Sequence, residues 1–236
     1  MKRILITYAT DGNYIRHATN LCNSALIHGF DEAYIYTQNN IDINFKNKCD
    51  NILSLPRGGG YWLWKPYLIL KTLNEKCQDD DIVVYCDSQY LFIENMNNFI
   101  DTHIANSPYN ITISHNKPNE PSYPEHMWSK GDAFYIINGQ TVAEDNTLQA
   151  WAGFVAMKKT SNSNSNCISV ISEWLSYAQD IRCISDMPST SIGNHKSFVE
   201  NRHDQTVLSL VAKKYSIPFF HFPCRYLQNI RVPYRY

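Results

Sequence analysis

Polar side chains that suit ligand binding directly follow an apolar run at 82–85, in the stretch DIVVYCDSQ. The run predicts a buried strand, and Asp87, Ser88 and Gln89 stand where that strand ends. Ligands of open α/β sheets bind beyond the carboxyl ends of the strands, so these three residues are candidates for a ligand site. An aspartate after a strand also caps a following helix, and the sequence leaves both interpretations open for Asp87.

A second candidate for ligand binding is the stretch RGGGYWLWKP at 57–66. Its three glycines permit a positive φ or a close approach of the backbone to a ligand. Lys65 then stands beside Pro66 at the start of a predicted helix, and an ammonium group near a helix N-terminus suits a diphosphate. The spacing is not that of a Walker loop. The alternative interpretation is a glycine-rich turn followed by a buried aromatic cluster.

These residues depend for their positions on an alternation of predicted strands and helices. The predicted strands lie at 3–8, 33–37, 51–55, 81–87, 110–114, 148–157 and 218–222. The predicted helices lie at 11–28, 65–76, 94–106, 167–180 and 203–215, and loops at 115–132, 160–166 and 186–197. The alternation predicts an α/β doubly wound domain, with a mostly parallel central sheet flanked by helices on both faces.

Composition narrows the classes of protein that the chain can represent. Its 236 residues carry a net charge of −1, so bulk electrostatics give no attraction to nucleic acid or to an anionic membrane. The seven cysteines are odd in number and form no Cys-x-x-Cys pair, so we expect reduced thiols in a cytoplasmic protein rather than a disulfide framework or a zinc site. The apolar stretch after Arg3 is too short for a signal or a membrane-spanning segment.

The segment YATDGNY, with a predicted helix after it, resembles the nucleotide-binding start of retaining galactosyltransferases of the GT-A fold, a class that includes lipooligosaccharide galactosyltransferases and glycogenin. In that family an aspartate of this segment binds the uracil ring and a nearby tyrosine packs on the base. The resemblance therefore implies nucleotide binding by Ala9, Thr10, Asp11, Asn13 and Tyr14. A carboxylate can accept from uracil N3–H and an aromatic face can stack on a base. Tyr14 could instead be a core contact of the helix.

The strand end VVYCDSQ resembles the Asp-x-Asp motif of the same family, in which both acids hold a divalent cation. Asp87 matches the first acid, Gln89 replaces the second, and Ser88 between them is placed near the nucleotide. His221 matches a late metal-ligating histidine, although the glycines that flank it in the family are absent and a core histidine is the alternative. The resemblance implies Mn²⁺, with Mg²⁺ as the other option, to neutralise the leaving diphosphate. Because Gln89 carries no charge, a weaker affinity for the metal is expected.

Two further segments resemble the part of the family that surrounds the donor sugar. In LQAWAGFVAM, Ala152 and Gly153 match an Asn-Ala-Gly strand, while Trp151 replaces the asparagine and could stack on a sugar or lie in the core. In HDQTVLSLV, Asp204 and Gln205 match residues that bind sugar hydroxyls and lie near the anomeric carbon. Asp204 could also cap its helix. A basic residue at the position of Lys65 contacts the diphosphate or the donor sugar in the family.

The resemblance covers about residues 3–222 and implies one GT-A domain over 1–236, with a nucleotide-binding half at about 1–115 and an acceptor and donor-sugar half at about 116–236. It implies a hexosyltransferase of polysaccharide biosynthesis that moves a sugar from a UDP-sugar to a glycan or glycolipid acceptor. The resemblance favours retention of configuration, and inversion with a carboxylate base is the alternative that the sequence leaves open. The arginines and tyrosines of 225–236 suit a peripheral contact at the inner face of a membrane, or a packed tail. The alternatives are a non-catalytic nucleotide- or glycan-binding module and a sugar-phosphate nucleotidyltransferase. The latter needs a glycine-rich signature that ATDGNY lacks.

Overall fold

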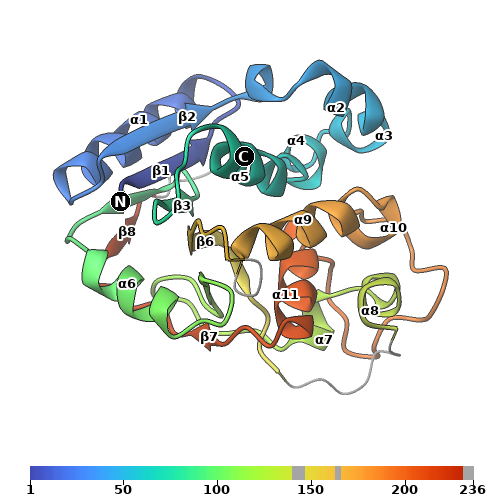
Figure 1. The fold of residues 1–236 in the computed structure, drawn as a ribbon. Coiled ribbons are helices and arrows are strands. Elements are labelled where there is room, and N and C mark those ends of the chain that lie inside the picture. The colour runs from blue at the N-terminus through green and yellow to red at the C-terminus, as the bar shows by residue number, and fades with distance from the viewer. Residues whose placement is uncertain (140–146, 163–165, 231–236) are drawn as a thin grey trace.

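A six-stranded mixed sheet forms the centre of the molecule in the computed structural model, which describes residues 1–139, 147–162 and 166–230 (Figure 1). The strand order is β2-β1-β3-β6-β5-β7. Its strands are β1 (Arg3–Tyr8), β2 (Glu32–Tyr36), β3 (Ile82–Cys86), β5 (Ile111–Ser114), β6 (Trp151–Lys158) and β7 (Phe219–Phe220). The β1–β2, β1–β3 and β5–β7 pairs are parallel, and β6 is antiparallel to β3 and β5. The predicted mostly parallel α/β sheet is therefore confirmed, and it takes strands from both predicted halves of the chain.

Helices cover both faces of this sheet. One core, which contains Ile4 and Val83, packs the sheet against α5 (Trp64–Glu75), α9 (Cys167–Ala178) and α11 (Asp204–Lys214). The opposite core, which contains Leu5 and Val84, packs it against α1 (Gly12–Ile27) and α6 (Asn97–Ala105). Neighbouring residues of one strand thus enter different cores, as the alternation of side chains along a strand requires. The shorter helices are η1 (Gln38–Asn40), α2 (Ile43–Lys48), α3 (Asp50–Leu53), α4 (Gly58–Tyr61), α7 (Glu125–Trp128), α8 (Gly131–Asn138) and α10 (Ile181–Ile184).

Two features of the fold differ from the sequence prediction. The strand predicted at 51–55 is wrong, because 50–53 is helix α3, whose Ile52 and Leu53 amides donate to the Cys49 carbonyl. A short apolar run does not distinguish a strand from a buried helical turn. The structure also has a ribbon of β4 (Tyr90–Phe92) and β8 (Leu227–Asn229) that was not predicted. This pairing packs part of the C-terminal tail, whereas 163–165 of the predicted surface loop and 231–236 of the tail lie outside the described residues.

The glycine-rich stretch forms a left-handed turn that begins at α4. Five consecutive residues have positive φ: Gly58 (61°), Gly59 (58°), Gly60 (92°), Tyr61 (52°) and Trp62 (60°). A left-handed conformation costs a residue with a side chain about 1–2 kcal/mol, so the three glycines lower the cost of the turn and the two aromatic residues raise it. The sequence left open a positive φ or a close approach of the backbone in this segment, and the structure shows the positive φ. Strained backbone of this kind is concentrated at functional sites.

We expect Gly60→Ala to destabilise the protein more than Gly59→Ala. Both residues are left-handed, so both variants should lose about 1–2 kcal/mol of unfolding free energy through backbone strain. A Cβ on Gly60 would also lie 2.6 Å from the Leu53 Cα, whereas a Cβ on Gly59 would meet nothing closer than Trp64 Nε1 at 3.7 Å. That overlap should add about 1–3 kcal/mol for Gly60→Ala alone. Urea denaturation measures the difference, and equal losses would show that the turn is not held against Leu53.

Candidate functional site

A cleft of about 620 Å³ opens at the edge of the sheet where β1 and β3 end. Because β6 runs antiparallel to its neighbours, its first residues lie at the same edge, and the first residues of α5 and α11 also line the cleft. The position agrees with the expectation that ligands bind beyond the strand ends. Twelve of the predicted site residues line it: Ala9, Thr10, Tyr14, Lys65, Asp87, Ser88, Gln89, Trp151, Ala152, Gly153, Asp204 and Gln205.

A buried ammonium group lies between two carboxylates at the floor of the cleft. Lys65 Nζ is 2.8 Å from Asp204 Oδ2 and 3.7 Å from Asp87 Oδ1, and it donates to the Ala152 carbonyl at 3.2 Å. Lys65 is 4% exposed and Asp204 3% exposed. The cleft therefore has a fixed charged centre that joins β3, β6, α5 and α11.

Aromatic packing fixes the start of α5 and with it the direction of Lys65. The Trp64 ring is stacked on Tyr8 with 3.8 Å between the ring centroids, and Trp64 Nε1 donates to the Gly58 carbonyl of the left-handed turn. Lys65 Nζ lies 4.9 Å from the centre of the Tyr85 ring. The alternative interpretation of this stretch, a glycine-rich turn with buried aromatic residues, describes its packing, while the role of Lys65 toward a diphosphate stays a prediction.

The two carboxylates share one ammonium group, which shapes the pKa values of the site. Burial raises the pKa of Asp204 to about 6; Lys65 acts against this shift and the charge of Asp87 adds to it. Burial lowers the pKa of Lys65, but Asp204 and Asp87 together outweigh it, so the net shift is upward. Tyr85 donates to Asp87 Oδ1 at 2.7 Å, and burial together with this carboxylate raises the pKa of Tyr85 well above its usual range. At neutral pH we therefore expect the Lys65–Asp204 ion pair to be formed.

The two aspartates do not act as helix N-caps. The ribbon strand β4, and not a helix, follows Asp87. His203 is the N-cap residue of α11, and Asp204 lies in the first helical turn with its side chain on Lys65. The side chains of both aspartates are thus directed at the charged centre.

The nucleotide-binding residues predicted after β1 separate into two groups. Ala9, Thr10 and Tyr14 line the cleft, and Tyr14 is 46% exposed, so it is no core residue of α1. Asp11 and Asn13 are exposed and lie outside the cleft lining, and the Asp11 side chain makes no capping hydrogen bond to α1. Their predicted contact with a nucleobase stays a prediction.

Trp151 lies at the boundary between the core and the cleft. It is 3% exposed and its ring meets Tyr90 and Phe222 edge to face at 5.4 and 5.8 Å. Its indole also covers Gly153, where a Cβ would lie 2.3 Å from Trp151 Nε1. Trp151 therefore packs as a core residue and reaches the cleft with part of its surface.

The structure does not bring all three predicted metal ligands together. Asp87 and Gln89 line the cleft, but His221 does not, and its ring lies 5.4 Å from that of His115. Asp87 Oδ1 already accepts from Tyr85 and faces Lys65, whose charge would repel a divalent cation. Among residues 1–139, 147–162 and 166–230, no group of three or more His, Cys, Asp or Glu side chains is arranged to hold a metal. These residues do not fit the predicted cation site, so we derive no step through a metal.

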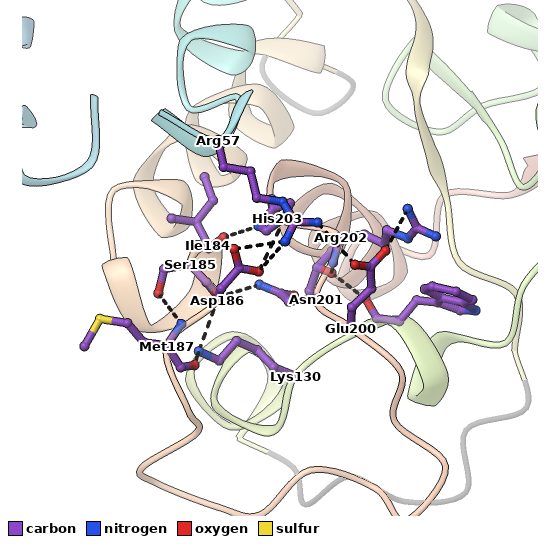
Figure 2. Close-up of polar contacts among 12 residues, drawn as sticks. Arg57, Lys130, Ile184, Ser185, Asp186, Met187, Glu200, Asn201, Arg202 and His203 are labelled. Carbon is purple, nitrogen blue, oxygen red and sulfur yellow. Dashed lines mark hydrogen bonds and ion pairs between the residues drawn. The ribbon is translucent and has the colours of Figure 1, made fainter. Parts of the chain in front are cut away.

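One wall of the cleft was not predicted from the sequence, and Figure 2 shows the contacts that hold it. Arg57 lines the cleft and pairs with Asp186 at 3.0 Å and with Glu200 at 3.2 Å. Glu200 also pairs with Arg202 at 3.1 Å, and the Arg202 guanidinium lies 4.2 Å from the Trp128 ring centre. Two guanidinium groups are thereby fixed beside the charged centre.

His203 and Lys117 also line the cleft and were missed by sequence reasoning. His203 Nδ1 donates to the Ile184 carbonyl at 2.8 Å (Figure 2). The His203 ring is also stacked on Tyr61 of the left-handed turn. A signal for this wall was present in the sequence, because Arg57 directly precedes the three glycines, and Arg202 and His203 directly precede Asp204.

Comparisons with known proteins find similar solved structures but no matching sequence. No family model matches the sequence, and no curated protein sequence does. Similar solved structures are mouse xyloside xylosyltransferase 1 in its apo form (12% identity, TM-score 0.49, 95% of this chain and 86% of that chain) and the galactosyltransferase LgtC with donor and acceptor sugar analogues (15%, 0.43, 88% and 70%). A third is the bifunctional glycosyltransferase WbbM in its apo form (12%, 0.48, 89% and 37%). All three are glycosyltransferases, the class that the sequence resembles. At these identities and TM-scores the similarity carries no argument about activity, which we derive from the cleft.

Proposed function

We propose that this protein is a glycosyltransferase that moves a hexosyl group from a UDP-sugar to a hydroxyl group of a glycan or glycolipid. The observation that carries the proposal is the Lys65 ammonium group, held between Asp204 and Asp87 where the strands end. Among the described residues of the lining, four side chains are cationic and two are anionic: Arg57, Lys65, Lys117, Arg202, Asp87 and Asp204. An excess of cations at a strand-end cleft suits a ligand that contains a diphosphate.

The arrangement suggests a place for each part of the donor. The nucleoside would lie at the β1 end, where Thr10 and the exposed ring of Tyr14 form the lining. The sugar would lie between Asp204 and Gln205 on α11 and the start of β6. The diphosphate then falls between them, within reach of Lys65. The nucleotide-binding and sugar-binding halves of the predicted domain would thus meet at the charged centre.

Transfer breaks the bond between the anomeric carbon and the diphosphate oxygen and forms a bond from that carbon to the acceptor oxygen, whose proton passes to the leaving diphosphate. Negative charge develops on the leaving diphosphate, where Lys65 and the guanidinium groups of the wall can stabilise it. Positive charge develops on the sugar ring, beside the carboxylate of Asp204. Fixed groups of this kind act most strongly in a cleft from which the ligand has displaced water.

Retention of configuration is the stereochemical course that we propose. Inversion requires a carboxylate that is free to take the proton of the acceptor hydroxyl. In the described lining the carboxylates are Asp87 and Asp204; Asp87 accepts from Tyr85, and Asp204 is paired with Lys65. Neither is placed as a free base.

The proposal also includes the location of the protein in the cell. All seven cysteines lie in the described residues and none forms a disulfide, which suits the cytoplasmic location that we propose. No helix in the part of the chain that the structure describes is long and apolar enough to cross a membrane. A peripheral contact of the C-terminal tail with the inner face of a membrane stays a prediction; Tyr226 and Leu227 of that tail are buried in the core that contains Leu5.

A panel of UDP-sugars tests the proposed function. We expect the protein to release UDP from at least one UDP-hexose when a glycan acceptor is present, and the Asp87→Ala variant, which should remain folded, to release none. Each reaction is run with chelator and with added Mn²⁺. Binding of UDP without release from any donor would identify a binding module instead, and formation of a UDP-sugar from UTP and a sugar phosphate would identify a nucleotidyltransferase.

A further inference from the structure

The amide of Gln205 is held in one orientation at the edge of the cleft. Its Nε2 donates to Gln149 Oε1 at 2.7 Å, and its Oε1 accepts from the Ala152 amide at 3.3 Å. Gln205 and Ala152 line the cleft, whereas Gln149 is 3% exposed and is not part of the lining. The nitrogen end of the Gln205 amide therefore meets a residue outside the cleft lining, and the oxygen end meets a residue of the lining.

The partners of Gln149 determine how its own amide is oriented. Gln149 Nε2 lies 3.1 Å from Glu125 Oε1 and 3.0 Å from the Trp128 carbonyl oxygen. A carboxylate and a carbonyl group only accept hydrogen bonds, so the NH₂ end of Gln149 must face them. Its oxygen end must then face Gln205, and only the NH₂ end of Gln205 can meet an oxygen. Rotating either amide by half a turn would place two acceptors or two donors against each other.

A buried carboxylate anchors this chain of hydrogen bonds. Glu125 is fully buried, and Lys213 Nζ lies 2.7 Å from its Oε2. The Ser129 and Ser209 hydroxyl groups also donate to it. An unpaired charge at this depth would be costly, but these partners satisfy both oxygens of Glu125. The network is therefore stable in one arrangement of donors and acceptors.

We propose that Gln149 is a positioning residue, which, held by Glu125 and the Trp128 carbonyl, fixes the Gln205 amide with its oxygen toward the donor sugar. This inference rests on the proposed transfer function and extends it to a residue outside the cleft. The oxygen is the negative end of the amide dipole, and positive charge develops on the sugar as its bond to the diphosphate breaks. A reversed amide would present two N–H donors to that charge and oppose the reaction.

Replacing Gln149 by methionine tests this role, because methionine has a similar length and neither donates nor accepts strongly. The Gln205 amide then loses the partner of its nitrogen end, and only the Ala152 N–H still favours the observed orientation. We expect kcat to fall by up to about 100-fold, the effect of misplacing a reacting group, while KM for the donor and UDP affinity stay close to the wild-type values. Ile100→Val, which perturbs the core on the other face of the sheet, is the control for lost stability and should keep the wild-type kcat. A kcat of Gln149→Met no lower than that of Ile100→Val would overturn the proposal.

A double-mutant cycle with Gln205→Glu tests the orientation without any assay of transfer. A glutamate has oxygens at both ends, so in the wild-type background one of them would face Gln149 Oε1, and the urea midpoint should fall. In the Gln149→Met background that conflict is absent, so the same substitution should lower the midpoint by clearly less. Equal shifts in both backgrounds would overturn the proposed orientation. Because the cycle measures stability alone, its outcome is separate from that of the UDP-sugar panel: a protein that transfers no sugar would still show the coupling.

Discussion

The Lys65→Met variant is expected to lose roughly 3–5 kcal/mol of unfolding free energy, the usual cost of breaking a buried ion pair from one side. Methionine keeps most of the apolar stem of the lysine but removes the ammonium group. Asp204, which is 3% exposed, would then have no counter-ion and would lie beside Asp87, of the same sign, so it must either stay ionised while buried or take up a proton at neutral pH. Urea denaturation at neutral pH measures the loss.

The double variant Lys65→Met, Asp204→Asn separates the structural role of the pair from its functional role. Asparagine has the shape of aspartate without its charge, so the double variant should recover much of the lost stability. Transfer should stay absent in both variants, because neither has the cation that we assign to the leaving diphosphate. If the double variant were no more stable than Lys65→Met, the buried charge of Asp204 would not be the cause of the loss. If it regained transfer, Lys65 would have no direct role in the reaction.

The elements that the sequence predicted well are those with a clear periodicity. The strand at 3–8 matches β1, and α1 has Ala18, Leu21, Cys22 and Ala25 on its buried face, as helical spacing requires. The α3 helix and the β4–β8 ribbon could not be predicted in the same way. The α3 helix is a single helical turn. The ribbon pairs segments that lie far apart in the sequence, and no local pattern indicates which segment pairs with which.

In the candidate site too, local sequence patterns predicted residues, but contacts between distant segments could not be predicted. The rule that ligands bind at strand ends predicted Asp87 as a site residue, and the glycine run with its following helix predicted Lys65. Both residues line the cleft. The sequence did not reveal that Lys65 pairs with Asp204, because this contact depends on how α5 and α11 pack on the sheet. His221 follows β7 as the resemblance requires, yet the structure places it beside His115 and outside the cleft. The order of motifs along the chain therefore predicted most of the lining but not which side chains meet.

Asp204 is expected to make activity and stability respond to pH in opposite directions. Burial raises its pKa from 3.8 to about 6, so in the folded protein it takes up a proton at a higher pH than in the unfolded chain. Protonation breaks the ion pair with Lys65 and removes the charge that we place beside the donor sugar. Transfer should therefore fall as the pH is lowered through about 6. Asp204→Asn should be inactive across the whole range, and a wild-type rate that stays constant through this range would contradict the role of Asp204.

The same shift has the opposite sign for stability. Because the folded state binds this proton more tightly than the unfolded chain, the contribution of Asp204 to stability is fully present below its unfolded pKa and is lost as the pH rises through its folded pKa. The change between about pH 4 and neutral pH should be up to roughly 3 kcal/mol. Carboxylates with lowered pKa values, such as Asp132 and Asp81, make the stability change with pH in the opposite direction. The quantity to measure is therefore the difference in unfolding free energy between the wild type and Asp204→Asn at each pH. Relative to the variant, the wild type should be most stable at acid pH, where it is least active. A difference that does not change with pH would show that Asp204 titrates normally, and the buried pair would then need another explanation for its place in the cleft.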